Sequence, residues 1–143
     1  MPNLHPIAIH VPIVLLTVGL LLDTLGVLLK KDHYEWFGSL SQAAGTVGLA
    51  IGVLTGLLAK SGVTVSAEGK SFLEIHEQIA FVVIALASSL LLWRISNRML
   101  LPRKYRAMYL LVSLLLVGLM WTGAWYGGEL VFRFGVGVQT QLH

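Results

Sequence analysis

Three histidines stand near the start of long apolar segments of the chain. His10 lies four residues after Pro6, His76 lies four residues after Phe72, and His5 precedes the first segment. Ionisable side chains inside a membrane are costly, so intramembrane histidines indicate function. A helix rises about 1.5 Å per residue, which places His10 and His76 each about 6 Å inside its segment. These two imidazoles are therefore predicted to face each other at one level.

Two imidazoles on facing helices suit the axial ligation of a haem iron. The chain has no cysteine, which excludes thiolate metal sites and covalently attached haem. We therefore predict one non-covalent haem b with His10 and His76 as axial ligands and His5 as an assisting or alternative ligand. Two other interpretations stay open. The histidines bond to carbonyls or headgroups at the interface, or they bind zinc, copper or iron together with Glu74 and Glu77.

Four long apolar segments must position these side chains, at roughly 6–29, 36–59, 72–93 and 105–126. Each reaches the roughly 20 residues that cross a bilayer as a helix. With 56% hydrophobic and 12% charged residues, the chain does not have the composition of a soluble domain. The apolar runs also do not alternate as barrel strands do. We predict an all-α fold with one domain, residues 1–143. It is an integral membrane four-helix bundle of up-down-up-down topology with a lipid environment and no nucleic-acid partner.

Local signals predict where the helices begin and end. The patterns at 32–35 and 71–74 resemble capping boxes that open the second and third helices. Pro102 suits the start of the fourth helix, and Gly127-Gly128 suits its end. No internal repeat is detected.

Basic residues are unevenly distributed between the two predicted membrane faces. One face has Lys60, Lys70 and Arg133; the other has Lys30, Lys31, Arg94, Arg98, Arg103, Lys104 and Arg106. Lys and Arg in short loops favour the cytoplasm. Both termini and the three histidines are therefore predicted to face outward, towards the periplasm, from a bacterial inner membrane.

Small residues form a stripe along the second segment, at Ala44, Gly48, Gly52 and Gly56. Such stripes allow two helices to pack closely. A flat macrocycle lying against Gly52 and Gly56 is the other use, and the two can coexist.

Several other residues have simpler predicted roles. Asp23, a carboxylate well inside a span, is expected to pair with Arg94 or a helix hydroxyl. Trp121 and Trp125 fit the outer aromatic belt, or else wall the cofactor cavity. His33, in a polar loop, and His143, at the C-terminus, are not expected to be ligands.

The opening pattern His-Pro-x-x-x-His-x-Pro-Ile at 5–13, the later His76 and the closing Gly-Gly-x-Leu-Val at 127–131 resemble a known family. It is the family of bacterial membrane proteins called domain of unknown function 2231. The resemblance implies a four-helix module. It also hints at electron transfer, because some members are joined to cytochrome c or Rieske-type domains. The closing segment here has no histidine, which limits the expectation to one haem.

The leading hypothesis is a small b-type cytochrome module that carries electrons near the outer face and is not itself a catalyst. Its partner would be a periplasmic cytochrome c or Rieske-type protein. A rival hypothesis is a cofactor-free accessory subunit that packs into a larger complex, or into a homo-oligomer, through the glycine stripe. The third hypothesis is a metal-binding membrane protein that uses the same histidines.

Overall fold

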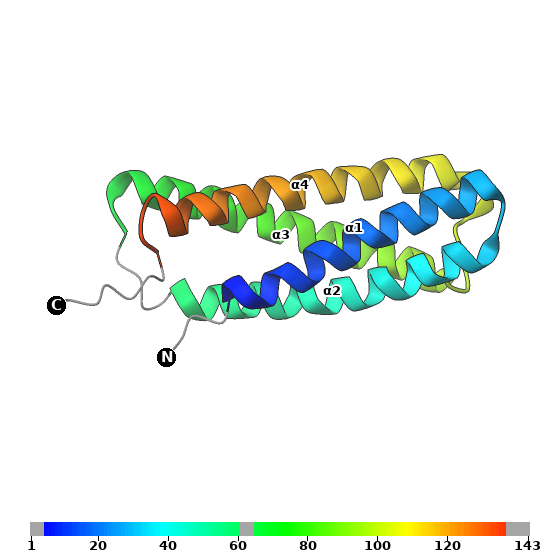
Figure 1. Cartoon of the computed structure of the whole chain (residues 1–143), viewed down its shortest axis with the longest axis horizontal. Helices are drawn as coiled ribbons and strands as arrows, with labels where there is room; N and C mark the ends of the chain where they lie inside the picture. Colours follow the sequence, from blue (N-terminus) through cyan, green and yellow to red (C-terminus); the bar gives the residue numbers. More distant parts are fainter. Residues whose placement is uncertain (1–4, 61–64, 137–143) are drawn as a thin grey trace.

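The computed structural model describes residues 5–60 and 65–136. Its elements are α1 (His5–Leu29), α2 (Asp32–Lys60), α3 (Ala67–Ser96), the short 3₁₀ turn η1 (Arg103–Tyr105) and α4 (Arg106–Phe132). The helices run alternately up and down, so α1 begins at the end of the bundle where α4 finishes (Figure 1). All four are long and apolar enough to cross a membrane. The predicted all-α membrane four-helix bundle is confirmed.

The bundle consists of two helical hairpins, α1 with α2 and α3 with α4, and most tertiary contacts lie within a hairpin. Figure 1 shows the hairpins converging at one end and splayed at the end where α1 begins. Glycines let α1 approach α2. A Cβ atom added at Gly52 would lie 2.8 Å from Ile9, and one at Gly48 would lie 3.3 Å from Pro12. The stripe on α2 is thus a surface for helix packing, as one of its two interpretations predicted.

The two hairpins bury equivalent positions that are 71 residues apart. Positions 12, 16, 19 and 23 of α1 correspond to positions 83, 87, 90 and 94 of α3, and all eight are buried. In the same way, buried positions 38, 42, 45, 46, 49 and 52 of α2 correspond to 109, 113, 116, 117, 120 and 123 of α4. The fold is therefore an internal repeat, which the sequence analysis did not detect.

The repeat is hidden because equivalent core residues differ in size and charge. Gly38 corresponds to Tyr109, and Asp23 corresponds to Arg94. The space beside Gly38 is taken by Asp23 of its own hairpin, whereas the equivalent position in the other hairpin carries the large Tyr109 ring. Identity is lost at these positions while the pattern of burial is retained.

Two predictions about helix ends are wrong. Helix α3 begins at Ala67, because the Ser66 side chain accepts a hydrogen bond from the backbone N–H of Gly69 at 3.2 Å. Ser71 is therefore inside the helix and is not its cap. Glycines 127 and 128 lie within α4, which continues to Phe132. Pro102 directly precedes the fourth helical run, which begins as η1 and continues as α4 from Arg106.

The outer surface of the bundle suits lipid. Large apolar side chains on all four helices are exposed, among them Val11, Leu58, Leu92 and Leu111. Trp121 and Trp125 are also exposed and line neither of the two cavities described below. The interpretation of these two residues as part of an outer aromatic belt stays a prediction.

Candidate functional site

One end of the bundle, called here the histidine end, brings His5 of α1 and His76 of α3 together. Their ring centres are 6.3 Å apart and their planes are inclined at 83°. Helices α1 and α3 lie diagonally across the bundle, since among the described residues the close backbone contacts of each are with α2 and α4. The two imidazoles therefore face each other across its central axis.

Each of these histidines is held by a backbone carbonyl of the neighbouring helix in its own hairpin. Nδ1 of His5 donates to the carbonyl oxygen of Gly52 at 2.9 Å, and Nδ1 of His76 donates to that of Gly123 at 2.8 Å. A carbonyl only accepts, so Nδ1 carries a proton in each ring, and in the neutral form of such a ring the lone pair is on Nε2. Histidines that bind metal usually donate their other N–H to a carbonyl or carboxylate in this way.

A second glycine lies directly under each ring. A Cβ atom at Gly56 would be 3.0 Å from Cε1 of His5, and one at Gly127 would be 3.2 Å from Cε1 of His76. The same His-Gly-Gly arrangement thus occurs in both hairpins. Gly52 and Gly56 were predicted from the sequence as residues of the cofactor site, whereas Gly127 was predicted to end the fourth helix. The missed signal is a histidine followed by glycines 47 and 51 residues later, twice in one chain.

Two cavities flank the histidine pair, and His5 and His76 line both. A cavity of about 110 Å³ lies between α2 and α3, with Gly56, Lys60 and Phe81 in its wall. A larger one of about 320 Å³ lies between α1 and α4, with walls that include His10. Most of the other residues in both walls are apolar. The larger cavity falls within the size range of small-molecule sites, about 300–1,000 Å³.

His10 lies apart from the facing pair. Its side chain is exposed and borders the larger cavity, at the position equivalent to Phe81 in the repeat. The estimate of equal depth assumed that both helices begin at one level. The two helices do not begin at one level: His76 is the tenth residue of α3, yet its ring lies beside that of His5, the first residue of α1. The assignment of His10 as an axial ligand stays a prediction.

Burial favours the neutral form of His5, which lies just before the membrane-spanning part of α1. Desolvation is the largest influence and lowers its pKa from 6.5. The hydrogen bond to Gly52 raises the pKa, and the charge of His76 lowers it. A neutral imidazole is the form that binds a metal ion.

The remaining sequence candidates do not join this site. Glu74 is exposed, and Glu77 forms an ion pair of 2.6 Å with Lys60. Across residues 5–60 and 65–136, no group of three or more His, Cys, Asp or Glu could hold a metal ion. His33 is exposed in the first turn of α2, where a loop was predicted, and His143 lies outside the described residues.

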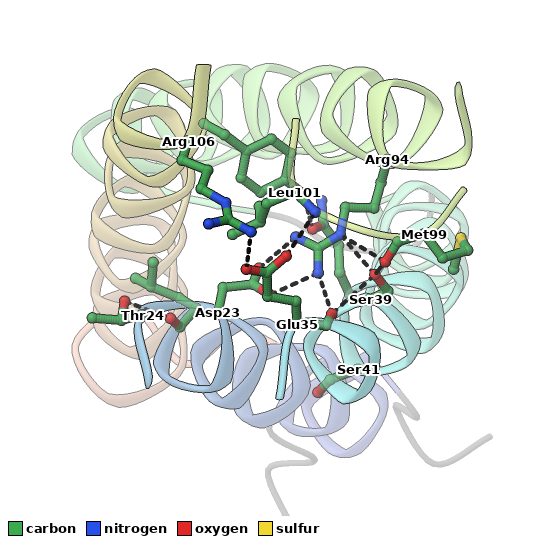
Figure 2. Close-up of polar contacts among 12 residues, drawn as sticks. Asp23, Thr24, Glu35, Ser39, Ser41, Arg94, Met99, Leu101 and Arg106 are labelled. Atoms are coloured by element: carbon green, nitrogen blue, oxygen red, sulfur yellow. Dashed lines mark hydrogen bonds and ion pairs between the residues drawn. The ribbon is translucent and has the colours of Figure 1, made fainter. Parts of the chain in front are cut away.

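The opposite end of the bundle contains a buried ionic network (Figure 2). Arg94 donates from its two terminal nitrogens to the two carboxylate oxygens of Asp23, at 2.9 and 2.7 Å, and both side chains are fully buried. Arg94 also donates to Ser39 Oγ at 2.6 Å and to the backbone carbonyl of Glu35. The predicted pairing of Asp23 with Arg94 is confirmed.

A second ion pair extends this network to α4. Glu35 is buried, and its carboxylate lies 2.7 Å from Arg106 and accepts from the backbone N–H of Leu101 at 3.1 Å. Figure 2 shows these groups converging from α1, α2, α3, the segment before α4 and the first residue of α4. Two acids are therefore balanced by two arginines, and the partners in each pair are 71 residues apart.

The four spans and the bundle define the class of the protein, an integral membrane four-helix protein. The family model described as predicted membrane protein (DUF2231) matches residues 1–140, and the chain belongs to this family. This confirms the resemblance seen in the sequence. No curated protein and no solved structure matches the chain.

Proposed function

We propose that this protein is a small b-type cytochrome module that holds one haem between His5 and His76. The observation that carries the proposal is the facing ring pair, with both Nδ1 atoms bonded to carbonyls. A metal ion about 2 Å from one nitrogen of each of two opposed imidazoles would separate the ring centres by about 6 Å. The observed separation of 6.3 Å is compatible with that arrangement.

The number of protein donors favours haem over a bare ion. A zinc site uses three or four protein ligands, whereas a porphyrin supplies four nitrogens and leaves two axial positions for the protein. Within the described part of the chain, two histidines meet without a third metal-binding side chain close by. The metal-ion hypothesis therefore has less support than the haem hypothesis.

The two cavities give a flat macrocycle room on both sides of the ring pair. A macrocycle lying between His5 and His76 would extend into the 110 Å³ cavity on one side and the 320 Å³ cavity on the other. Of the cavity-lining residues in the described chain, only Lys60 is a Lys or Arg. To bind a haem propionate, Lys60 would exchange its present ion-pair partner, Glu77.

The glycine stripe gives little support to the accessory-subunit hypothesis. Gly48, Gly52 and Gly56 are each within contact distance of α1 side chains, so the stripe is occupied inside the protein. In the proposed function the haem supplies the redox chemistry, and the protein holds the haem and tunes its potential.

The proposed orientation places the histidine end outward in a bacterial inner membrane. Arg94 and Arg106 lie in the ionic network and do not count as loop charges. The end opposite the histidines then has five basic residues and the histidine end has three. This difference still favours a cytoplasmic location for the opposite end. A periplasmic cytochrome c or Rieske-type protein would then exchange electrons at the histidine end.

The test is the absorption spectrum of the full chain, purified in detergent after expression with added haem. We expect a low-spin spectrum with a reducible α band. His5→Ala and His76→Ala should each abolish low-spin haem, because alanine offers no donor. His10→Ala is the decisive comparison, since it removes an imidazole from the same cavity and should leave haem bound with a small shift in potential.

His33→Ala removes an exposed imidazole at the far end and serves as the matched control. A loss of low-spin haem in His10→Ala, with His5→Ala unaffected, would restore the His10–His76 pair. If the wild type takes up no haem, the cytochrome proposal is wrong. A stoichiometric metal in such a sample would support the metal-binding hypothesis, and its absence the accessory-subunit hypothesis.

A further inference from the structure

Helices α1 and α3 both end in a Schellman motif at the end of the bundle opposite the histidines. The backbone N–H of Lys31 bonds to the carbonyl of Gly26 at 3.0 Å, and that of Met99 bonds to the carbonyl of Arg94 at 2.9 Å. In each motif the N–H bonds to the carbonyl five residues earlier. The residue just before that N–H, Lys30 or Arg98, must adopt a left-handed conformation, and glycine normally occupies this position.

Basic residues occupy both of these positions. Lys30 has φ 55° and Arg98 has φ 56°, a region that a side chain with Cβ adopts only at a cost in free energy. At the histidine end, by contrast, the left-handed residue after α4 is Gly135, with φ 67°. Residues held in costly conformations are a reason to look for a function.

Together with Lys31, Arg103 and Lys104, these two residues form the basic end of the bundle. All five side chains are exposed, and none forms an ion pair within the described part of the chain. Two of the three basic residues at the histidine end are paired there, Lys60 with Glu77 and Arg133 with Glu68. The cations of the basic end thus have no acidic partner among the described residues.

Aromatic rings at the basic end indicate the depth of these cations. Trp36 and Tyr105 are both about half exposed, and the ring of Trp93 lies 6.2 Å from that of Tyr105. Trp and Tyr concentrate at the level of lipid headgroups. The five cations therefore lie where phosphate groups are available from the lipid itself.

We propose that the basic end binds the headgroups of anionic phospholipids, with Lys30 and Arg98 as its central contacts. The helix C-termini carry partial negative charge, which the two cations offset. Their left-handed conformation turns the chain at the membrane surface while keeping a charge at the turn. This function is independent of any cofactor at the histidine end.

The experiment measures how tightly short-chain phosphatidylglycerol binds the full chain in non-ionic detergent, with phosphatidylcholine as the neutral probe. The variant Lys30→Asn with Arg98→Asn removes both cations, and asparagine tolerates the left-handed conformation. Each cation near an anionic surface contributes about fivefold in affinity, so we expect about 30-fold weaker binding of phosphatidylglycerol. Lipid-free thermal stability should stay unchanged or rise.

A matched control, Lys70→Asn with Arg133→Asn, removes two exposed cations from the histidine end and should bind phosphatidylglycerol as the wild type does. A second test variant, Lys31→Gln with Lys104→Gln, leaves both helix ends intact and should also weaken binding. The proposal is overturned if the Lys30/Arg98 variant binds as tightly as the wild type, or if the control weakens equally. Unchanged lipid binding in both test variants would instead indicate an acidic protein partner.

Discussion

The two ends of the bundle use buried polar groups in opposite ways. At the basic end, which also contains the ionic network, the carboxylates of Asp23 and Glu35 form ion pairs with Arg94 and Arg106. Further hydrogen bonds join these groups to the backbone and to Ser39. At the histidine end, each ring is tied to one carbonyl of its own hairpin, and two cavities lie beside the pair.

This difference separates a structural role from a binding role. The ionic network connects the two hairpins directly, because Asp23 and Glu35 belong to one hairpin and Arg94 to the other. The bonds of His5 to Gly52 and of His76 to Gly123 each lie within one hairpin. One end therefore joins the two hairpins, while under the proposed function the other end orients the two imidazoles for a ligand.

Arg94→Met should have the largest effect on stability. It leaves the Asp23 carboxylate buried without its partner, which typically costs about 3–5 kcal/mol. We expect a large fall in the thermal unfolding midpoint in detergent. The exposed Arg103→Met is the control and should change stability by less than about 0.5 kcal/mol.

The double variant Asp23→Asn with Arg94→Met sharpens this prediction. It removes both charges, so part of the lost stability should return. If Arg94→Met unfolds at the same temperature as the wild type, the ionic network does not hold the two hairpins together.

Gly127→Leu should have an intermediate effect, concentrated at the histidine end. A side chain at Gly127 meets the His76 ring at 3.2 Å, so leucine must displace it and should cost about 1–3 kcal/mol through overpacking. Haem content, measured from the absorption spectrum, should fall with it. Gly118→Leu on the same helix is the matched control, because no atom lies within 4 Å of a Cβ there. Equal haem content in both variants would refute the role of Gly127 beneath the ring.

Ser66→Ala should have a small effect. It removes the hydrogen bond to Gly69 that caps α3, and such losses are typically about 1 kcal/mol. The thermal midpoint should fall slightly, and any haem spectrum should be unchanged because His76 lies two turns further along α3. A fall as large as that of Arg94→Met would contradict the division of roles between the two ends.

Single cysteines test the orientation without a measurable effect on stability. The chain has no native cysteine, so Glu68→Cys at the histidine end and Lys104→Cys at the basic end can each be labelled alone. We expect an impermeant thiol reagent to label position 68 in intact spheroplasts and position 104 only after lysis. The reverse pattern would place the histidines in the cytoplasm.

The sequence was sufficient to predict the features that depend on membrane energetics. Four apolar segments of sufficient length predicted the bundle, and the high cost of a buried charge predicted the partner of Asp23. The close packing of α2 was predictable because small residues recur at every fourth position. Each of these arguments uses local composition or the cost of leaving one group unpaired.

The histidine pair needed information that local patterns do not contain. The sequence gives depth only relative to each helix start, and the first residue of α1 lies opposite the tenth residue of α3, so equal counts from the two starts are not at one level. The repeat relates His5 directly to His76, but Gly38 and Tyr109 at equivalent positions conceal the repeat from a search for similar residues.

The two hairpins of the 71-residue repeat can be compared with a symmetric dimer of two identical hairpins. In such a dimer the positions of Asp23 and Arg94 would hold the same residue, and two like charges would meet across the axis. In a single chain the two hairpins can differ in sequence, so one can carry the acid and the other the base. The facing histidines need no such difference, since two identical donors serve equally well on opposite sides of one ligand. Equivalent positions thus differ where a complementary pair is useful, while His5 and His76 are the same residue type.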